Sequence, residues 1–216
     1  MPAPSKPQSH LRYPLTSILG RAGNVRVLRA IVADPSPQSA PQLAGVAGLT
    51  PQGTRLTLDA LAQQRLLLAH GAGRARLYTL NPSHPFAGAI AALFEEERRR
   101  RDALLESIRQ VLARHGEAVS AAWLYGSVAR GEDSPGSDLD IAVLVRSQAV
   151  ADRLREDLMP LEDEQALRIS LTVLTPEELA AVPEDDPWWS DVVRDGRVLK
   201  GSAPDQVRRR LVRAIA

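Results

Sequence analysis

Two apolar, strand-like segments joined by a short glycine- and serine-containing stretch constrain the fold of this chain more than any other feature. Residues 119–125 are apolar apart from Ser120, and residues 138–145 read DLDIAVLV. The stretch between them begins with a Gly-Ser turn and ends with the loop DSPGS. Because side chains alternate along a strand, we expect Asp138 and Asp140 on one face and Leu139 on the other. The pattern predicts a buried central strand that starts with two carboxylates.

Two carboxylates on one strand face would repel each other without a cation between them. A rise of ~3.3 Å per residue places Asp138 and Asp140 about 6–7 Å apart, close enough for each to raise the other's pKa. Hard oxygen ligands at this spacing suit Mg²⁺ or Mn²⁺. At the start of the stretch, Gly126 allows close backbone approach, and the Ser127 hydroxyl can hold a phosphate oxygen with the following N–H groups. With Arg130 as a further cationic contact, these parts predict phosphoryl or nucleotidyl transfer.

The segment GSVARGEDSPGSDLDIAV resembles the signature of the DNA polymerase β-like nucleotidyltransferases, particularly their minimal bacterial members. The Gly-Ser pair, the ten-residue gap and the Asp-x-Asp all match, as do Ala129-Arg130-Gly131 and Ser137. The resemblance covers Val119 to about Gly201. It implies a nucleoside triphosphate substrate, catalytic and metal-binding roles for Asp138 and Asp140, and nucleotide-binding roles for Gly126, Ser127, Arg130 and Ser137. The alternative interpretation is an N-capping serine followed by a solvated acidic loop.

A third carboxylate, which the fully active members carry on a neighbouring strand, is missing from its expected position. That strand should be residues 168–174, RISLTVL, whose polar phase includes Ser170 and Thr172. The nearest acids, at 162–164 and 177–178, fall at a loop or helix end and at a helix start. A general base contributes ~10²–10⁴-fold to a rate. Its absence leaves a slow enzyme, an enzyme whose substrate supplies the base, or a nucleotide-binding relic.

The charge of the chain is divided unevenly along its length. Residues 1–83 hold nine Lys/Arg and two acids, a net charge of +7, whereas residues 84–216 hold 18 basic and 24 acidic residues, a net charge of −6. This asymmetry predicts two domains, the first with an anionic partner such as nucleic acid. The alternative is a small basic domain that binds no nucleic acid.

The basic half has the element order of a winged helix-turn-helix domain. We expect a helix over 24–32, a second helix capped by Ser39, a third that starts at Thr50-Pro51, and strands at 66–68 and 76–80 around a tip at 70–73. LAGVAGLTPQGTRLTLDAL and GRARLYTLNPSHP resemble the helix-turn-helix and wing of small bacterial regulators. The resemblance implies base contacts by Gln52, Thr54 and Arg55, and phosphate contacts by Arg74 and Arg76. The alternative role is protein docking or dimerisation.

The sequence therefore predicts an α/β (α+β) two-domain chain, with a winged helix-turn-helix followed by a mixed β-sheet with flanking helices. The predicted boundaries are a flexible lead-in at 1–18, a DNA-binding domain at 19–83, a connecting helix at 84–116, a nucleotidyltransferase domain at 117–201 and a basic tail at 202–216. The connecting helix is also a candidate homodimer surface. The chain has no cysteine, and no apolar run approaches the ~18 residues of a membrane span, so we expect a cytoplasmic location and no membrane partner.

Two hypotheses for function follow. In the first, the protein is an enzyme that transfers a nucleoside monophosphate from a Mg²⁺-bound nucleoside triphosphate to a protein or small molecule. The resemblance implies that the acceptor can be a toxin-like protein partner. In the second, the protein is a non-catalytic DNA-binding regulator, or an antitoxin-like protein, whose transferase domain senses nucleotide or binds a partner. The Gly-Ser and Asp-x-Asp favour the first hypothesis, and the missing third acid favours the second.

Overall fold

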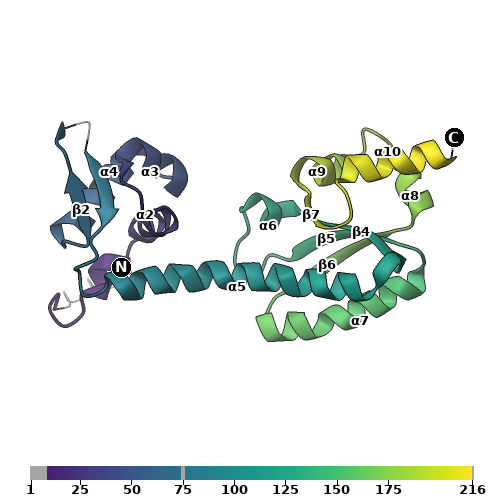
Figure 1. Ribbon diagram of the computed structural model, residues 1–216, viewed down its shortest axis with the longest axis horizontal. Helices are drawn as coiled ribbons and strands as arrows, with labels where there is room; N and C mark the ends of the chain where they lie inside the picture. The colour runs from purple at the N-terminus through teal and green to yellow at the C-terminus, as the bar shows by residue number, and fades with distance from the viewer. Residues whose placement is uncertain (1–8, 74–75, 216) are drawn as a thin grey trace, which may run out of the picture. The chain divides into compact units, whose positions relative to one another are not determined.

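The computed structural model describes residues 9–73 and 76–215 (Figure 1). The chain divides into two compact units, Met1–Arg99 and Arg100–Ala216. The division lies inside α5 (Ala87–Arg114), a single uninterrupted helix. Each unit has its own buried core.

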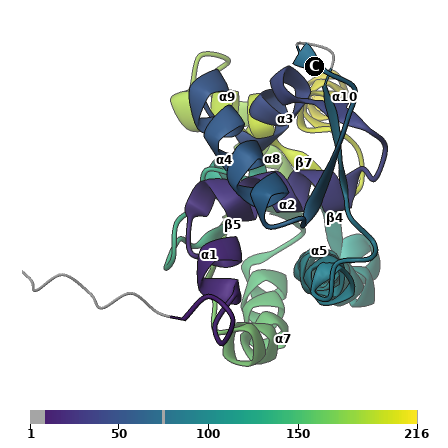
Figure 2. The same ribbon diagram turned by 90° about the vertical axis from the view of Figure 1, so that its left-hand side faces the viewer.

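The first unit combines short helices with a small antiparallel sheet (Figure 2). Two of its helices begin where the sequence predicted. Ser39 forms a capping box with Gln42 at the start of α3, and Thr50 Oγ1 accepts the Gly53 N–H at 3.1 Å at the start of α4. The sheet has the order β1-β3-β2. The elements in chain order are α1 (Leu15–Leu19), α2 (Ala22–Ala33), β1 (Gln38–Ser39), α3 (Ala40–Ala47), α4 (Pro51–Gln63), β2 (Leu67–His70) and β3 (Leu77–Leu80).

The core of the first unit comes from the apolar faces of its helices. α2, α3 and α4 pack one apolar face each against one another and against the start of α5. The first strand of the hairpin extends further than predicted. His70 pairs with Leu77 and so belongs to β2 rather than to the tip. Five of the side chains with no exposed surface are Val27, Leu28, Leu43, Leu58 and Leu61.

The second unit is built on one mixed sheet with the order β6-β5-β4-β7. The central strands β4 and β5 are antiparallel, β6 runs parallel to β5, and β7 is antiparallel to β4. Besides the end of α5, the elements are η2 (Gly116–Ala118), β4 (Val119–Tyr125), α6 (Gly126–Arg130), β5 (Leu139–Val145), α7 (Gln148–Gln165), β6 (Ile169–Leu174), α8 (Pro176–Ala181), α9 (Pro187–Asp195), β7 (Arg197–Lys200) and α10 (Pro204–Ile215).

Helices cover both faces of this sheet, as Figure 1 shows. Along β5, Ile141 and Val143 face the end of α5 and α7, whereas Ala142 and Leu144 face α8, α9 and α10. Burial on both faces accounts for the near-continuous apolar run of β5. The prediction of a mixed α+β fold with helices flanking the sheet is confirmed.

The face covered by α8, α9 and α10 has an aromatic centre. Trp123 of β4 is fully buried and meets Trp189 of α9 edge-on, with ring centroids 6.0 Å apart. The segment expected to be a basic tail forms α10, whose Val207 and Leu211 pack against this cluster. Among the residues the structure describes, no helix is long and apolar enough to cross a membrane.

Candidate functional site

The turn after β4 brings the backbone of Gly126 directly against the carboxylate of Asp140. Tyr125, the last residue of β4, pairs with Asp140 across the antiparallel ladder. Gly126 follows with φ +75°, in the left-handed region. A Cβ at this position would overlap the Asp140 carboxylate. The glycine is therefore required both by the backbone conformation and by the space beside the acid.

Asp138 and Asp140 lie close enough for their charges to interact, as the strand spacing predicted. The pKa of Asp140 is raised, first by burial and then by the neighbouring Asp138 carboxylate. A hydrogen bond from Ser170 and the positive charge of Arg130 oppose this rise. Asp138 comes one residue before β5, and its side chain is 44% exposed, with Arg168 Nε 3.9 Å from its Oδ1. The two carboxylates thus form an acidic corner that a cation would stabilise.

The positions where a third carboxylate was expected lie beside this corner and carry hydroxyl groups. In the parallel register of β5 and β6, Asp140 pairs with Ser170 and Ala142 pairs with Thr172. Ser170 lies beside Asp140 and opposes the rise in its pKa, and Thr172 Oγ1 is 2.8 Å from the hydroxyl oxygen of Tyr125. The structure therefore places both hydroxyl residues on the face of the sheet that carries Asp140.

Two of the acids that lie on either side of β6 in the sequence have structural roles. Glu162 Oε1 accepts the N–H of Ile169 at 2.6 Å, which fixes the end of α7 to the start of β6. Glu178 forms a capping box with Thr175 at the start of α8. Within the described ranges, no group of three His, Cys, Asp or Glu side chains is arranged to hold a metal ion.

Two carboxylates are nevertheless enough protein ligands for one class of metal site. Mg²⁺ commonly binds through one or two carboxylates together with substrate phosphates, rather than in an all-protein cage. The corner of Asp138 and Asp140 supplies hard oxygen ligands, and the raised pKa of Asp140 reflects its burial together with the negative charge of its neighbour. The residues present fit a metal ion that arrives with a phosphate ligand.

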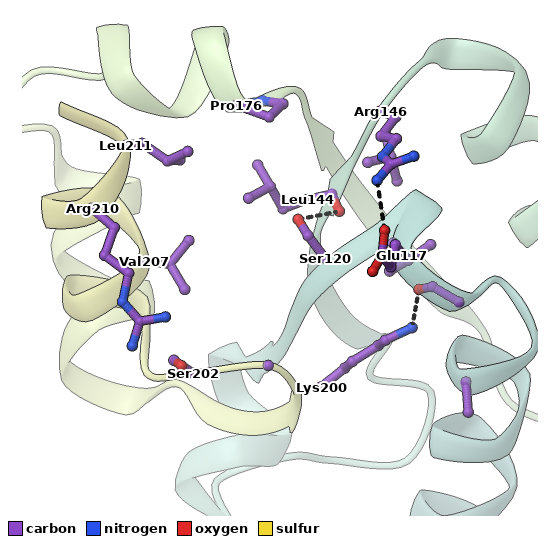
Figure 3. Close-up of a pocket in the computed structure, with 15 residues that line it drawn as sticks. Glu117, Ser120, Leu144, Arg146, Pro176, Lys200, Ser202, Val207, Arg210 and Leu211 are labelled. Carbon is purple, nitrogen blue, oxygen red and sulfur yellow. Dashed lines mark hydrogen bonds and ion pairs between the residues drawn. The ribbon is translucent and has the colours of Figure 1, made fainter. Parts of the chain in front are cut away.

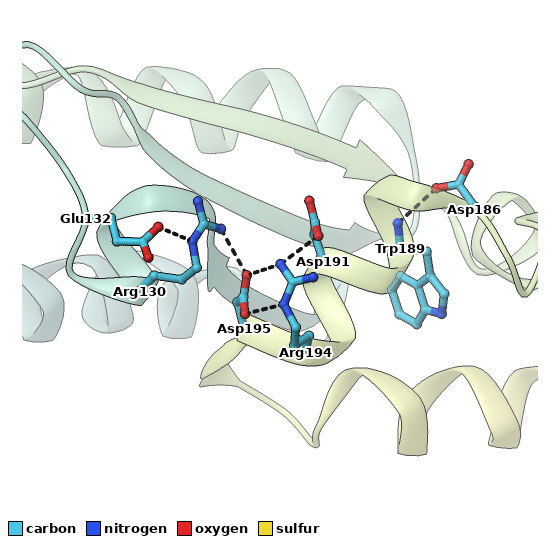
Figure 4. Close-up of polar contacts among 7 residues, drawn as sticks. All are labelled: Arg130, Glu132, Asp186, Trp189, Asp191, Arg194 and Asp195. Atoms are coloured by element: carbon cyan, nitrogen blue, oxygen red, sulfur yellow. Dashed lines mark hydrogen bonds and ion pairs between the residues drawn. The ribbon is translucent and has the colours of Figure 1, made fainter.

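Arg130, a predicted phosphate contact, is held by two carboxylates (Figure 4). Its Nε lies 2.7 Å from Glu132 Oε2, and its Nη1 lies 2.9 Å from Asp195 Oδ2. Asp195, at the end of α9, also binds Arg194, and these arginines lower its pKa to about 2, Arg194 having the larger effect. This network fastens α6 to α9. No sequence pattern indicates it, because Asp195 is 65 residues from Arg130 and marks only a helix end in the local sequence.

The two predicted serines of the site differ in their surroundings. Ser127 lies in the first turn of α6, directly after Gly126. Ser137 closes a turn, because its Oγ accepts the N–H of Ser134 at 3.0 Å. Ser137 thus shapes the loop that leads into Asp138, and its contact with nucleotide stays a prediction.

The first unit presents some of the predicted DNA-contacting residues and not others. Gln52 and Arg55 are exposed on α4, and Arg76 is exposed just before β3. The prediction for Thr54 is wrong: its side chain has no exposed surface, and Oγ1 donates to Thr50 O at 3.0 Å. A residue buried in the core cannot reach a base edge. Arg74 lies outside the described residues.

Several solved structures resemble the chain, all at low similarity. A toxin–antitoxin crystal structure with AMP-PNP matches at 19% identity and a TM-score of 0.36, covering 51% of this chain and 86% of that one. The AntR antimony-specific transcriptional repressor matches at 20% identity and a TM-score of 0.36, covering 48% and 96%. The complex of tri-AMPylated Shewanella oneidensis HEPN toxin with MNT antitoxin matches at 19% identity and a TM-score of 0.35, covering 53% and 85%. TM-scores this low do not establish a shared function.

The family of the second unit follows from a sequence match. A search of curated proteins found no significant match. A family model described as polymerase beta, nucleotidyltransferase, matches residues 106–182. The match spans the end of α5, β4, the Gly-Ser turn, both aspartates and β6. Residues 106–182 are therefore a nucleotidyltransferase domain of the polymerase beta family.

Proposed function

We propose that the second unit binds a nucleoside triphosphate with Mg²⁺ or Mn²⁺ and transfers its nucleoside monophosphate to a protein or small-molecule acceptor. One observation carries the proposal: the Gly126 turn lies directly against Asp140, so a phosphate chain and a metal ion would meet at one corner of the sheet. The proposal is consistent with the family match over the same residues.

Each residue of the corner has a distinct task in this proposal. Gly126 allows the turn to pass directly against the Asp140 carboxylate, and Ser127 offers a hydroxyl donor to a phosphate oxygen. Asp138 and Asp140 would hold the metal ion, whose chemistry is to neutralise charge on the phosphates. Arg130 can reach a phosphate once it leaves Asp195 or Glu132, and an arginine binds phosphate oxygens in a bidentate manner.

A second candidate function is favoured by the hydroxyl beside Asp140. Ser170 lies beside Asp140 at one of the two positions where a proton-accepting carboxylate was expected, and a serine hydroxyl is a poor general base. The loss of a base costs ~10²–10⁴-fold in rate, so a site of this kind can hold nucleotide without useful turnover. In this second function the domain senses nucleotide for a DNA-binding regulator.

Both functions include DNA binding by the first unit. Its helices α2, α3 and α4, followed by the hairpin of β2 and β3, have the order of a winged helix-turn-helix, with α4 as the recognition helix. Gln52 and Arg55 are exposed on α4, and residues 1–83 carry a net charge of +7. Positive charge on such a surface attracts the phosphate backbone, and the exposed polar side chains would then contact base edges.

Nucleotide binding is tested by calorimetry with ATP, GTP, CTP and UTP, each with and without Mg²⁺. We expect saturable binding of at least one nucleotide that requires Mg²⁺ and is lost in Asp138→Ala and Asp140→Ala. The proposal is contradicted if no nucleotide binds in a manner that these substitutions abolish. Far-UV circular dichroism of each variant excludes unfolding as the cause.

Transfer is tested separately, with α-labelled nucleotide, Mg²⁺ and a cell lysate as the source of acceptors. Label that becomes covalently attached, and that disappears in Asp138→Ala, supports the enzyme. Nucleotide binding without any label transfer supports the regulator instead, particularly if DNA binding changes when nucleotide is added.

A further inference from the structure

The second unit contains an open pocket of about 850 Å³ at the end of the sheet opposite to Asp140. Val119 and Ser120 at the start of β4 and Leu144 and Val145 at the end of β5 line it. Four residues of strand, about 13 Å, separate Asp140 from Leu144. The pocket is therefore distinct from the proposed nucleotide site. Its volume falls within the ~300–1,000 Å³ typical of pockets for small ligands.

The walls of this pocket are mainly apolar (Figure 3). Val207 and Leu211 of α10 form one wall, and Leu144 of β5 and Pro176 at the start of α8 lie across from them. Apolar surface of this kind gains ~25 cal/mol per Å² when a ligand removes it from water. The walls thus favour a ligand with an aliphatic or aromatic body.

Cationic side chains outnumber acidic ones at the pocket. Arg146, Lys200 and Arg210 line it, and Glu117 is the single acid among the lining residues. The ammonium group of Lys200 already has hydrogen-bond partners, because its Nζ donates to Leu112 O at 2.8 Å and to Gly116 O at 2.6 Å. The excess of positive charge favours an anionic ligand.

The arginines differ in how available they are. Arg146 Nη2 lies 3.0 Å from Glu117 Oε2, and the side chains of this pair are 65% and 90% exposed, so the pairing is weak. The side chain of Arg210 has no hydrogen bond or ion pair with any other residue that the structure describes. Its guanidinium is thus free to bind a carboxylate through two parallel hydrogen bonds.

We propose that this pocket binds a small monocarboxylate with an apolar body, whose carboxylate pairs with Arg210 and whose body lies between α10 and the ends of β4 and β5. A nucleotide is disfavoured here, because the lining offers no pair of acids for a metal ion and no glycine turn against a carboxylate. The proposal does not depend on the function assigned to the Asp138 corner.

The binding test uses dodecanoate as the probe, below its micellar concentration, with dodecanol as the uncharged control of equal length. All three tryptophans lie in this unit, and Trp123 Nε1 donates to the carbonyl oxygen of Ser202, a lining residue, at 2.8 Å. Tryptophan fluorescence and calorimetry are therefore suitable readouts. We expect one saturable site for dodecanoate and at least tenfold weaker binding of dodecanol, because the alcohol cannot make charge-assisted hydrogen bonds.

Matched variants separate this pocket from general surface charge. Arg210→Ala should weaken dodecanoate binding about tenfold or more, whereas Arg213→Ala, an exposed arginine on α10 outside the pocket, should leave it unchanged. Val207→Phe, which fills the pocket, should weaken both probes, and thermal melts check that it folds. Asp138→Asn should change neither probe. Equal effects of Arg210→Ala and Arg213→Ala, equal affinity for the alcohol, or no saturable binding would overturn the proposal.

Discussion

Ser170 on β6 and Asp140 on β5 are direct neighbours in the parallel register, and the Ser170 hydroxyl opposes the rise in the pKa of the Asp140 carboxyl group. A hydroxyl thus occupies one of the two positions at which a third acid was expected, beside the corner of Asp138 and Asp140 that we propose holds a metal ion. Substitution of Ser170 therefore tests whether a carboxylate at this position increases the activity of the site.

Ser170→Asp should therefore increase nucleotidyl transfer, because it places a proton-accepting carboxylate beside Asp140. We expect an increase of at least about tenfold, up to the ~10²–10⁴-fold that a general base in optimal geometry contributes. The measurement is the initial rate of label transfer from an α-labelled nucleotide. Ser170→Ala is the control for loss of the hydroxyl and should give no increase. An unchanged rate in Ser170→Asp, in a variant that still binds nucleotide, would contradict the assignment of this position.

Gly126→Ala should abolish nucleotide binding and also destabilise the fold. A non-glycine residue in the left-handed region costs about 1–2 kcal/mol. Gly131→Ala is a matched control: Gly131 has φ +73°, but an added Cβ there would have no neighbouring atom within 4 Å, whereas a Cβ on Gly126 would meet Asp140. Both variants should lose stability in urea unfolding, Gly126→Ala by more because of the overlap with Asp140, but only Gly126→Ala should lose Mg²⁺-dependent nucleotide binding. Equal nucleotide affinity in the two variants would refute this explanation.

The sequence predicts those parts of the site that depend on patterns of residues close together along the chain. Val119–Tyr125 is the strand expected from its apolar residues. The Gly126 turn and Asp140 follow it at a spacing that can be recognised in the sequence alone. Thr50 and its proline identify the start of α4 in the same way. These signals involve neighbours along the chain, so they do not require knowledge of the packing.

The rest of the site depends on contacts between distant residues. Arg130 meets Asp195 across 65 positions, and Tyr125 meets Thr172 across 47. Neither contact leaves a local pattern. The error at Thr54 is different, because it lies four residues before the buried Leu58, and helical periodicity already places it on the core face. The resemblance to known DNA-binding helices conflicts with the periodicity at this position, and the periodicity is correct.

Acid should weaken the link between α6 and α9, because the arginines around Asp195 lower its pKa to about 2, from an ordinary value of 3.8. Between these values the unfolded chain binds more protons than the folded chain, so the contribution to stability is present above pH ~4 and is lost as the pH falls towards 2. The measurement is urea unfolding of the protein and of Asp195→Asn at pH 6, 4, 3 and 2.5. The difference in stability between the two proteins should shrink as the pH falls.

The control for this pH dependence is Glu132→Gln, which removes the other carboxylate on Arg130. Glu132 is 65% exposed, and exposed ion pairs contribute only about 0–1 kcal/mol, so this variant should remain close to the original protein at every pH. A constant difference between the protein and Asp195→Asn from pH 6 to 2.5 would show that the Asp195 carboxylate does not stabilise the α6–α9 contact.

Two adjacent residues of α4 should separate DNA binding from stability. Arg55 is exposed, so Arg55→Ala should weaken DNA binding and reduce its salt dependence without changing the free energy of unfolding. Thr54 is buried and donates to Thr50 O, so Thr54→Val should cost about 0.5–1.5 kcal/mol of stability and leave DNA affinity unchanged. Fluorescence anisotropy with labelled duplex at 50–200 mM salt, together with urea unfolding, measures both effects. If Thr54→Val is fully folded but loses DNA affinity, Thr54 contacts a base despite its burial. If Arg55→Ala binds DNA as tightly as the original protein, the DNA-binding surface lies elsewhere.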